Sequence, residues 1–359
     1  MRCKWCNQKL IINNTKIINN DFDIYCNACN NIVYKTTQSK TFVGILSVLS
    51  LCLYFFALFA DLLDVYIFDH ITSSFYSSVK FLFHSDIVSA LLIFATIIVL
   101  PLFMMLLIFN INYQTNLKIP KHTTDILIKI YYKIKPWHMI EVYFIGLLLA
   151  MIKLYELSDV AILSGFYLTI LYILNLYILS LVFNPLPTDF QEYKKISKNS
   201  LYKAVLFLCL AIIFIYPAYS LPMMNFSKHG VLYPTNIYEG INSFMQDGDL
   251  VVPVIIFVAS IIIPAIKIVS LIFMIIMTKY NIFKGHRKLA TKIYILLDFF
   301  GKYSLLDVFV VILASSYIQF NDLVNIQPGE AFVPFILVVI FTMIASKSFD
   351  TRLLWYNKP

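Results

Sequence analysis

The sequence predicts an all-α polytopic membrane protein. Hydrophobic residues make up 60% of its 359 residues and charged residues only 13%, whereas a soluble domain carries about 25% charged residues. The mean hydropathy is +0.78. The apolar residues form continuous runs rather than the alternating segments of about ten residues that build a membrane β-barrel, and this favours helices.

Eight apolar runs are long enough, or nearly so, to cross a bilayer core, which takes about 20 helical residues. They cover residues 41–60, 87–110, 138–155, 160–183, 203–221, 250–278, 303–320 and 332–347. The last run is the shortest. The sequence therefore predicts about eight transmembrane helices.

The basic residues orient these helices. The formal net charge is +8, and Lys and Arg gather in every second connecting segment. If the N-terminus lies inside, 24 of the 28 basic residues fall on the inner side, as the positive-inside rule requires. We therefore expect both termini to be cytoplasmic. Membrane topology explains the net positive charge, so the charge does not indicate that the protein binds nucleic acid.

Residues 1–38 precede the first apolar run and carry Cys3, Cys6, Cys26 and Cys29. Their spacing, C-x2-C-x19-C-x2-C, is close to the zinc-ribbon pattern, in which four thiolates surround one zinc ion. Disulfides are rare in the reducing cytoplasm. A redox-active Cys-x-x-Cys or chance spacing are the alternatives, and the βαβ context of a redox motif is missing. We predict a small cytoplasmic zinc ribbon with one structural zinc per chain.

The apolar part of the chain contains an internal repeat. The matching stretches are FATIIVLP (94–101) with FVASIIIP (257–264), and WHMIEVY (137–143) with YSLLDVF (303–309). Their offsets of 163 and 166 residues indicate a tandem duplication. We predict a first four-helix module at 39–190 and a second at 191–359, both entering the membrane in the same direction.

Polar residues interrupt the apolar runs of the second module. Ser260 and Lys267 are seven residues apart on one helix face, with Pro264 between them, and the next two runs contain Asp307 and Thr342. A Lys at membrane depth costs about 2.5–3.5 kcal/mol or more, so it usually faces a cavity or a partner. We predict a pair between Lys267 and Asp307. The alternative is an Asp near the interface and a Lys that extends to the headgroups, without a function.

The first module differs at the matching positions. Met104 lies near the position that matches Lys267, whereas Glu141 matches Asp307. The first module thus has the acid but no base that opposes it. This difference predicts that the functional centre is confined to the second module.

Several stretches together resemble the paraquat-inducible protein A family of bacterial inner-membrane proteins. They are the two Cys-x-x-Cys pairs, YSLPMMNF (219–226), SIIIPAIK (260–267), LLDVFVV (305–311) and MIASKSFDTRLLW (343–355). The resemblance implies an inner-membrane location and transport of lipid between the inner and outer membranes. It also implies a periplasmic partner with mammalian-cell-entry domains that forms a hydrophobic conduit.

Two departures from the family pattern stand out. The linker NPLPTDFQEYKKISKNS lacks the second set of cysteines that family members often carry, and ALFADLLDV replaces a Leu-Pro-x-Met motif in the first module. In the second module this motif is Leu221, Pro222, Met223 and Met224. Pro222 is expected to end a helix, which leaves the two methionines at the outer interface to touch acyl chains. The alternative is that these residues belong to an ordinary belt of aromatic and Met side chains at the membrane interface, without a role in lipid binding.

Three classes of function remain open. The first is a component that loads or accepts phospholipid through the second module. The second is a carrier of a small solute, which would require polar sites in both halves. The third is a zinc-dependent assembly or sensor protein without transport. We find no set of nucleophile, base and orienting group and no nucleotide-binding glycine loop, so an enzyme is not expected.

Overall fold

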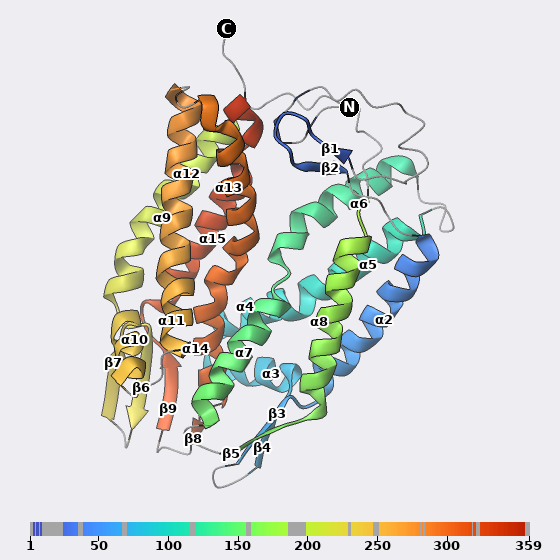
Figure 1. Ribbon diagram of the computed structural model, residues 1–359. Coiled ribbons are helices and arrows are strands. Elements are labelled where there is room, and N and C mark those ends of the chain that lie inside the picture. The colour runs from blue at the N-terminus through green and yellow to red at the C-terminus, as the bar shows by residue number, and fades with distance from the viewer. Residues whose placement is uncertain are drawn as a thin grey trace.

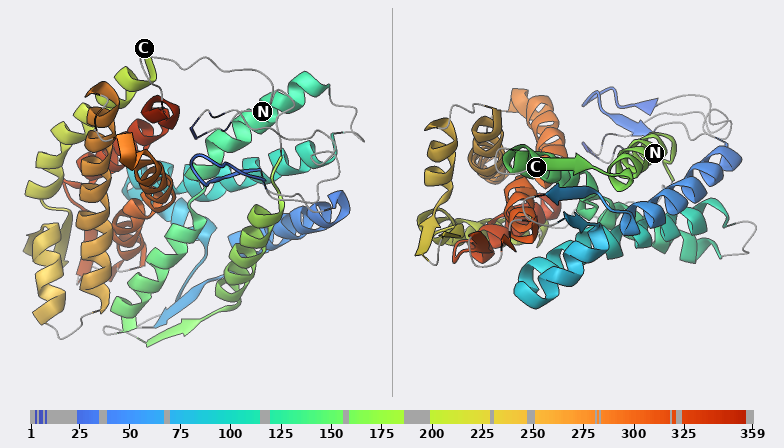
Figure 2. Two further views of the ribbon diagram at one scale, coloured as in Figure 1. Left: turned by 45° about the horizontal axis from the view of Figure 1, so that its top comes forward. Right: turned by 90° about the horizontal axis from the view of Figure 1, so that it is seen from below.

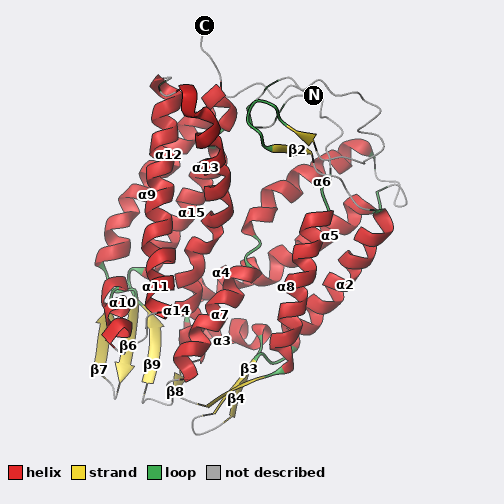
Figure 3. Cartoon of the chain, viewed as in Figure 1, coloured by secondary structure: helices red, strands yellow, loops and turns green. Residues whose placement is uncertain are grey.

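The computed structural model describes residues 3, 5–6, 8, 24–34, 39–66, 70–114, 120–155, 159–185, 199–228, 231–246, 251–280, 282, 284–317, 319–320 and 324–355. Most of these residues are helical (Figure 3). The expectation of an α-helical membrane protein is therefore confirmed.

The two halves of the chain share one order of elements, to which the second half adds η4, β8 and η6. The label η marks a 3-10 or π segment. The first half contains α2 (Lys40–Phe59), β3 (Leu63–Tyr66), β4 (His70–Ser73), α3 (Phe75–Ser85), α4 (Ile87–Ile93), η1 (Phe94–Val99), α5 (Leu100–Asn112), α6 (Lys121–Ile134), η2 (Lys135–Trp137), α7 (Ile140–Tyr155), β5 (Asp159–Ile162) and α8 (Ser164–Val182). The second half contains α9 (Asn199–Ser220), β6 (Met224–Lys228), β7 (Val231–Thr235), α10 (Ile237–Gln246), α11 (Val251–Phe257), η3 (Val258–Ile262), α12 (Ile263–Tyr280), η4 (Lys284–His286), α13 (Arg287–Phe300), η5 (Gly301–Leu305), α14 (Leu306–Tyr317), β8 (Gln319–Phe320), β9 (Val324–Pro328), α15 (Phe332–Ser348) and η6 (Thr351–Trp355). The module boundaries at 39–190 and 191–359 stay predictions.

Six helical segments within the described residues are long and apolar enough to cross a membrane. They are Lys40–Phe59, Ile87–Asn112, His122–Ile152, Ser164–Val182, Asn199–Ser220 and Pro253–Tyr280. Phe332–Ser348 is apolar but shorter, with 17 residues. The predicted run 303–320 corresponds to η5 and α14, which continue α13 through a 3-10 turn. The structure thus establishes a multi-pass protein, although it does not confirm the count of eight.

Helix packing gives each half a bundle. The first and last long helices of each half lie side by side, α2 along α8 and α9 along α15. The two bundles stand next to each other in Figures 1 and 2, and α7 packs against α14 between them. Gly146 on α7 allows this approach, because a Cβ there would lie 3.2 Å from the Cβ of Phe309 on α14.

Two small antiparallel sheets were not expected from the sequence. One has the strand order β4-β3-β5 and the other β7-β6-β9-β8. Each sheet joins strands from two separate loops of the same half, and both sheets lie at the end of the molecule opposite the β1–β2 hairpin (Ile24–Tyr25 and Ile32–Tyr34) and η6 (Figure 1). The strands have only two to five residues, so they add little to a predominantly helical fold.

A proline breaks the second long helix of the first half. Pro101 has no N–H, so the carbonyl of Ile97, four residues earlier, loses its helical donor. The helix widens into the π segment η1 just before this proline. The hydroxyl of Tyr54 on α2 donates to the carbonyls of Ile98 at 2.9 Å and Ile97 at 3.2 Å. This contact satisfies the free carbonyl, which has no water to bond inside a bilayer.

The second half repeats this arrangement. Pro264 follows the π segment η3, and the carbonyl that it leaves without a helical donor is that of Ser260. The hydroxyl of Tyr219 on α9 donates to this carbonyl. Tyr54 and Tyr219 therefore hold equivalent places in the two halves.

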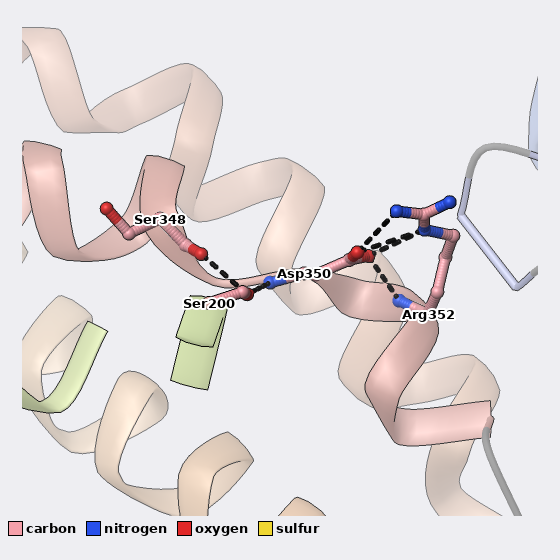
Figure 4. Close-up of polar contacts among 4 residues, drawn as sticks. All are labelled: Ser200, Ser348, Asp350 and Arg352. Carbon is pink, nitrogen blue, oxygen red and sulfur yellow. Dashed lines mark hydrogen bonds and ion pairs between the residues drawn. The ribbon is translucent and has the colours of Figure 1, made fainter. Parts of the chain in front are cut away.

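A polar clasp closes the second bundle near the C-terminus (Figure 4). The hydroxyl of Ser200 on α9 donates to the carbonyl of Ser348 at 2.8 Å and accepts from the N–H of Asp350 at 3.1 Å. The carboxylate of Asp350 in turn binds the guanidinium of Arg352, with a shortest distance of 2.6 Å. The clasp fixes the start of α9 to the end of α15.

Candidate functional site

Lys267 lies deep in the second bundle. Its side chain is 1% exposed, and its Nζ atom has no hydrogen-bond partner among the residues that the structure describes. It lines a small cavity of about 10 Å³ together with Asp298, Gly301, Met343, Ser346 and Lys347. A cavity of this size holds about one water molecule.

An ion pair forms one wall of this cavity. Nζ of Lys347 on α15 lies 2.6 Å from Oδ2 of Asp298 on α13. Gly301 forms another wall, because a Cβ at this glycine would lie 3.0 Å from Nζ of Lys267. The sequence analysis missed Asp298 because it assigned residues 279–302 to an inner loop, whereas they form α13 and the start of η5.

The other predicted polar residues have different surroundings. Ser260 is fully buried in η3, and its hydroxyl has no hydrogen-bond partner among the described residues. Thr342 is 1% exposed, but its hydroxyl donates to the carbonyl of Val339 in its own helix at 2.9 Å. The backbone of Asp307 belongs to α14, while its side chain lies outside the described residues. The pair between Lys267 and Asp307 therefore stays a prediction.

An apolar groove of about 290 Å³ lies next to this polar region. It runs between α11 and η3 on one side and η5 and α14 on the other. Its lining residues are Val254, Ile255, Val258, Ala259, Ile263, Tyr303 and Leu306. Ile263 precedes Lys267 by one helical turn on α12, so the groove and the cavity share a helix as well as the η5 turn.

The Leu-Pro-Met-Met stretch leaves α9 and enters β6. Leu221 and Pro222 are half-buried and follow the last residue of α9, as expected for a proline at a helix end. Met223 is 2% exposed and belongs to the hydrophobic core, so it does not lie open at the interface as the sequence analysis expected. Met224 begins β6.

The backbone of this stretch joins three segments. The N–H of Met223 donates to Thr235 at the end of β7, and its carbonyl accepts from Gly329 after β9, both at 2.9 Å. The carbonyl of Pro222 accepts from Ala331 at 2.9 Å. A Cβ at Gly329 would lie 2.3 Å from the carbonyl oxygen of Pro222. Only glycine fits there, so the stretch is a backbone junction.

The four N-terminal cysteines come together as the spacing predicts. Cys3, Cys6, Cys26 and Cys29 are buried, and their sulfur atoms all lie within 4.8 Å of one another. Sγ of Cys3 is 3.7 Å from Sγ of Cys29, and Sγ of Cys6 is 3.5 Å from Sγ of Cys26. Four converging sulfur ligands can hold a metal ion.

Contacts within the cluster shift the thiol pKa values in opposite directions. The hydrogen bond from the Cys6 thiol lowers the pKa of Cys3 to about 5. Burial raises the pKa of Cys29 to about 11. Metal ligands must be deprotonated thiolates, so a metal ion that binds this cluster must displace the thiol protons.

The cysteine cluster rests on the second bundle. The ring of Trp5 packs edge-on against that of Tyr294 on α13, with 6.4 Å between the centroids. Trp355 also packs against the cluster, and its indole N–H donates to the hydroxyl of Thr291 on α13 at 3.1 Å. The cluster thus braces α13, the helix that carries Asp298 to the Lys267 cavity.

Glu141 corrects one expectation from the sequence. Its carboxylate forms an ion pair with Lys302, which lies 161 residues later in the η5 turn of the other half. A base therefore does oppose this acid. The sequence analysis missed the pair because it searched for partners within one module, whereas this pair joins the two.

The fold and these sites define a class: a multi-pass membrane protein with two helical bundles, a metal-capable cysteine cap and a buried cation in the second bundle. Residues 43–187 and 201–358 match the paraquat-inducible protein A family, and the chain belongs to this family. No solved structure matches the chain.

Three curated relatives are similar to part of the chain. The intermembrane transport protein PqiA of Escherichia coli strain K12 is 32% identical over 166 residues, which are 45% of this chain and 39% of that protein. The lipophilic envelope-spanning tunnel protein A of the same strain is 31% identical over 160 residues, 44% of this chain and 36% of that protein. The probable intermembrane transport protein of Haemophilus influenzae is 28% identical over 148 residues, which are 41% of this chain and 35% of that protein. The matched part thus spans well under half the length of these relatives.

Proposed function

We propose that this protein is the inner-membrane component of an intermembrane lipid transport system. Its second module loads or accepts phospholipid for a periplasmic partner with mammalian-cell-entry domains. Membership of the paraquat-inducible protein A family and the transport names of its relatives support this role. The proposal assigns no enzymatic activity to the chain.

The observation that carries the proposal is the buried ammonium group of Lys267 beside an entirely apolar groove. A phospholipid has an anionic phosphate joined to acyl chains, so it matches a cation next to apolar walls. The phosphate would supply the counter-charge that a Lys at membrane depth needs. We assign Asp307 as the counter-charge in the absence of lipid, with the hydroxyls of Ser260 and Thr342 beside it.

The orientation follows from the basic residues. With both termini cytoplasmic, the β4-β3-β5 and β7-β6-β9-β8 sheets face the periplasm. A periplasmic partner would then meet the sheet end of the molecule, where the Leu-Pro-Met-Met junction also lies. Lipid that leaves the groove on this side would be passed directly to the partner.

The metal is proposed to be one structural zinc ion, held by Cys3, Cys6, Cys26 and Cys29. A Zn–S bond is about 2.3 Å, which places sulfurs of a tetrahedral site about 3.8 Å apart. The Sγ–Sγ distances of 3.5 Å between Cys6 and Cys26 and 3.7 Å between Cys3 and Cys29 fit this geometry. Four protein ligands leave no open position, so the ion would supply folding energy to the cap rather than chemistry.

Lipid capture tests the proposal. A photo-crosslinking residue at Val258, which lines the groove, should capture a phospholipid that stays with the purified protein, and mass spectrometry identifies it. The matched control is Ala95 in η1, the equivalent position of the first half. Lipid at both positions in equal yield, or at neither, would contradict a lipid site in the second module.

A further inference from the structure

The η5 turn connects three sites through consecutive residues. Gly301 lies against Nζ of Lys267 and lines its cavity. Lys302 forms the ion pair with Glu141 of the first half. Tyr303 lines the apolar groove. A shift of this one turn would therefore change the cavity, the groove and the contact between the two halves together.

The Glu141 side of the contact is firmly held. Glu141 lies in the first turn of α7, and this helix packs closely on α14 through Gly146. The rings of Tyr143 and Phe309 meet at the same interface, with centroids 5.7 Å apart. Since α14 directly follows η5, α7 is positioned to hold the turn from the side of the first half.

We propose that Glu141 is a positioning residue for the lipid site. Through Lys302 it holds the η5 turn, and so it sets the opening of the groove and the place of Gly301 against Lys267. This inference rests on the proposed function, because it gives the first module a role in shaping the lipid site of the second.

The repeat places a different residue at the position of Lys302. With the offset of 166 residues, Glu141 corresponds to Asp307 and Lys302 corresponds to Pro136. Pro136 has no charge with which to hold an acid of the other half. The η2 turn of the first module does contain a lysine, Lys135, but it lies one residue before the position that matches Lys302.

Charge reversal tests the inference with two readouts. The first readout is lipid capture from the crosslinking residue at Val258, on the wall of the groove opposite η5. The second is the rate at which N-ethylmaleimide modifies Leu306→Cys, a groove residue that is 5% exposed. The background carries Cys52→Ser and Cys209→Ser, so that the exposed native thiols do not react.

Glu141→Lys and Lys302→Glu should each lower lipid capture and raise the maleimide rate, by roughly threefold to tenfold. In the double variant the acid and the base have exchanged places and attract each other again, so both readouts should return to within about twofold of the starting protein. If either reversal fails to accumulate, Glu141→Gln and Lys302→Gln remove the attraction without adding repulsion. Asp350→Asn is the control, because it breaks an ion pair of the distant clasp.

The outcomes separate the two proposals. If the single variants lower the melting temperature but leave both readouts unchanged, the pair is only structural and the inference is wrong. A double variant that folds but is not restored overturns it too. If the starting protein captures no lipid at Val258, the proposed function fails. The maleimide rate then still decides whether Glu141 positions the turn.

Discussion

The two halves of this protein have the same frame but different polar chemistry. In each half a tyrosine from the first long helix satisfies a carbonyl freed by a proline, and two loops join into one sheet. Within the described residues, the second half adds a buried lysine, a hydroxyl without a hydrogen-bond partner in its π segment, and contact with the cysteine cap. The frame is thus common to both halves, and we expect the functional difference between them to depend on the few polar positions at which they diverge.

Lys267→Met should have the largest effect on function. It makes the second half resemble the first, where Met104 lies near the matching position. Transport should be lost, while the protein remains at least as stable, because replacing a buried charge by an apolar side chain is often neutral or stabilising by about 1–4 kcal/mol. Complementation of a strain that lacks the protein measures the first effect, and the melting temperature measures the second.

Two further variants sharpen this result. Met104→Lys should lower stability by about 2.5–3.5 kcal/mol, because it buries a cation in a half with no matching site. Asp307→Asn should reduce complementation like Lys267→Met. Full complementation by both Lys267→Met and Asp307→Asn would show that the two charges are merely tolerated.

Removal of the metal should affect the second half far more than the first. Cys26→Ser takes away one ligand, and the cap then loses a binding free energy of about 10–16 kcal/mol. Trp5 then no longer packs against Tyr294 of α13, so hydrogen exchange should accelerate in α13 and stay unchanged in α6, its counterpart. Cys52→Ser, at an exposed position of α2, is the matched control.

Acid should have the same effect as Cys26→Ser. The thiols lose their protons when the metal binds, and burial raises the pKa of Cys29 to about 11, so that lowering the pH favours the protonated thiols over the metal. Elemental analysis after dialysis should find less metal at pH 5 than at pH 8. A metal content that is the same at both values, and is unaffected by Cys26→Ser, would disprove the assignment of these ligands.

Sequence patterns predicted what depends on local composition. Continuous apolar runs located the six long helices, and the Cys-x-x-Cys spacing predicted a cluster that the structure does bring together. The buried position of Lys267 followed from its place in an apolar run. Each of these signals lies within a few neighbouring residues, and none depends on how distant segments pack.

Contacts between distant segments were not predictable in this way. The strands are short and pair across loops that are separated by whole helices, so they leave no alternating pattern to recognise. Glu141 and Lys302 are 161 residues apart and belong to different halves. The Leu-Pro-x-Met motif, which the first half lacks, also gave no indication that both halves build a backbone junction.

The first half does build an equivalent junction with other residues. Leu62 donates to Ser73 at 2.8 Å and accepts from Leu163 at 3.1 Å, as Met223 does with Thr235 and Gly329. Gly165 approaches this segment as Gly329 approaches Pro222, because a Cβ at Gly165 would lie 2.5 Å from the carbonyl oxygens of Ala60 and Asp61. The backbone geometry of this junction is therefore the same in both halves, although the amino-acid residues differ.

Gly165→Ala and Gly329→Ala should therefore destabilise the protein to a similar extent, by about 1–3 kcal/mol or more, since the new methyl group meets backbone that cannot move aside. Thermal unfolding of the two variants measures the effect. Gly240→Ala on α10 is the control, because a Cβ there meets nothing within 4 Å. A large loss for Gly329→Ala and none for Gly165→Ala would mean that the two junctions are not equivalent.

Removal of the Tyr54 or Tyr219 hydroxyl should have the smallest effect on stability, and it compares one equivalent hydrogen bond between the two halves. Tyr54→Phe and Tyr219→Phe each leave a carbonyl near a proline without its hydroxyl donor. Hydrogen bonds between membrane helices contribute about 0.6 kcal/mol on average and at most about 1.7, so both variants should lose stability on this scale. Transport should fall only for Tyr219→Phe, because the carbonyl that it bonds belongs to Ser260, in the π segment beside the groove that we propose for lipid.

A double-mutant cycle tests the cause. Pro264→Ala supplies an N–H that can bond the carbonyl of Ser260 within the helix, so Tyr219→Phe should cost less stability in that background than in the starting protein. Pro101→Ala should reduce the cost of Tyr54→Phe in the same way. If the costs add without coupling in both halves, the tyrosines stabilise the bundles by packing alone, and the shared frame does not depend on carbonyls freed by proline.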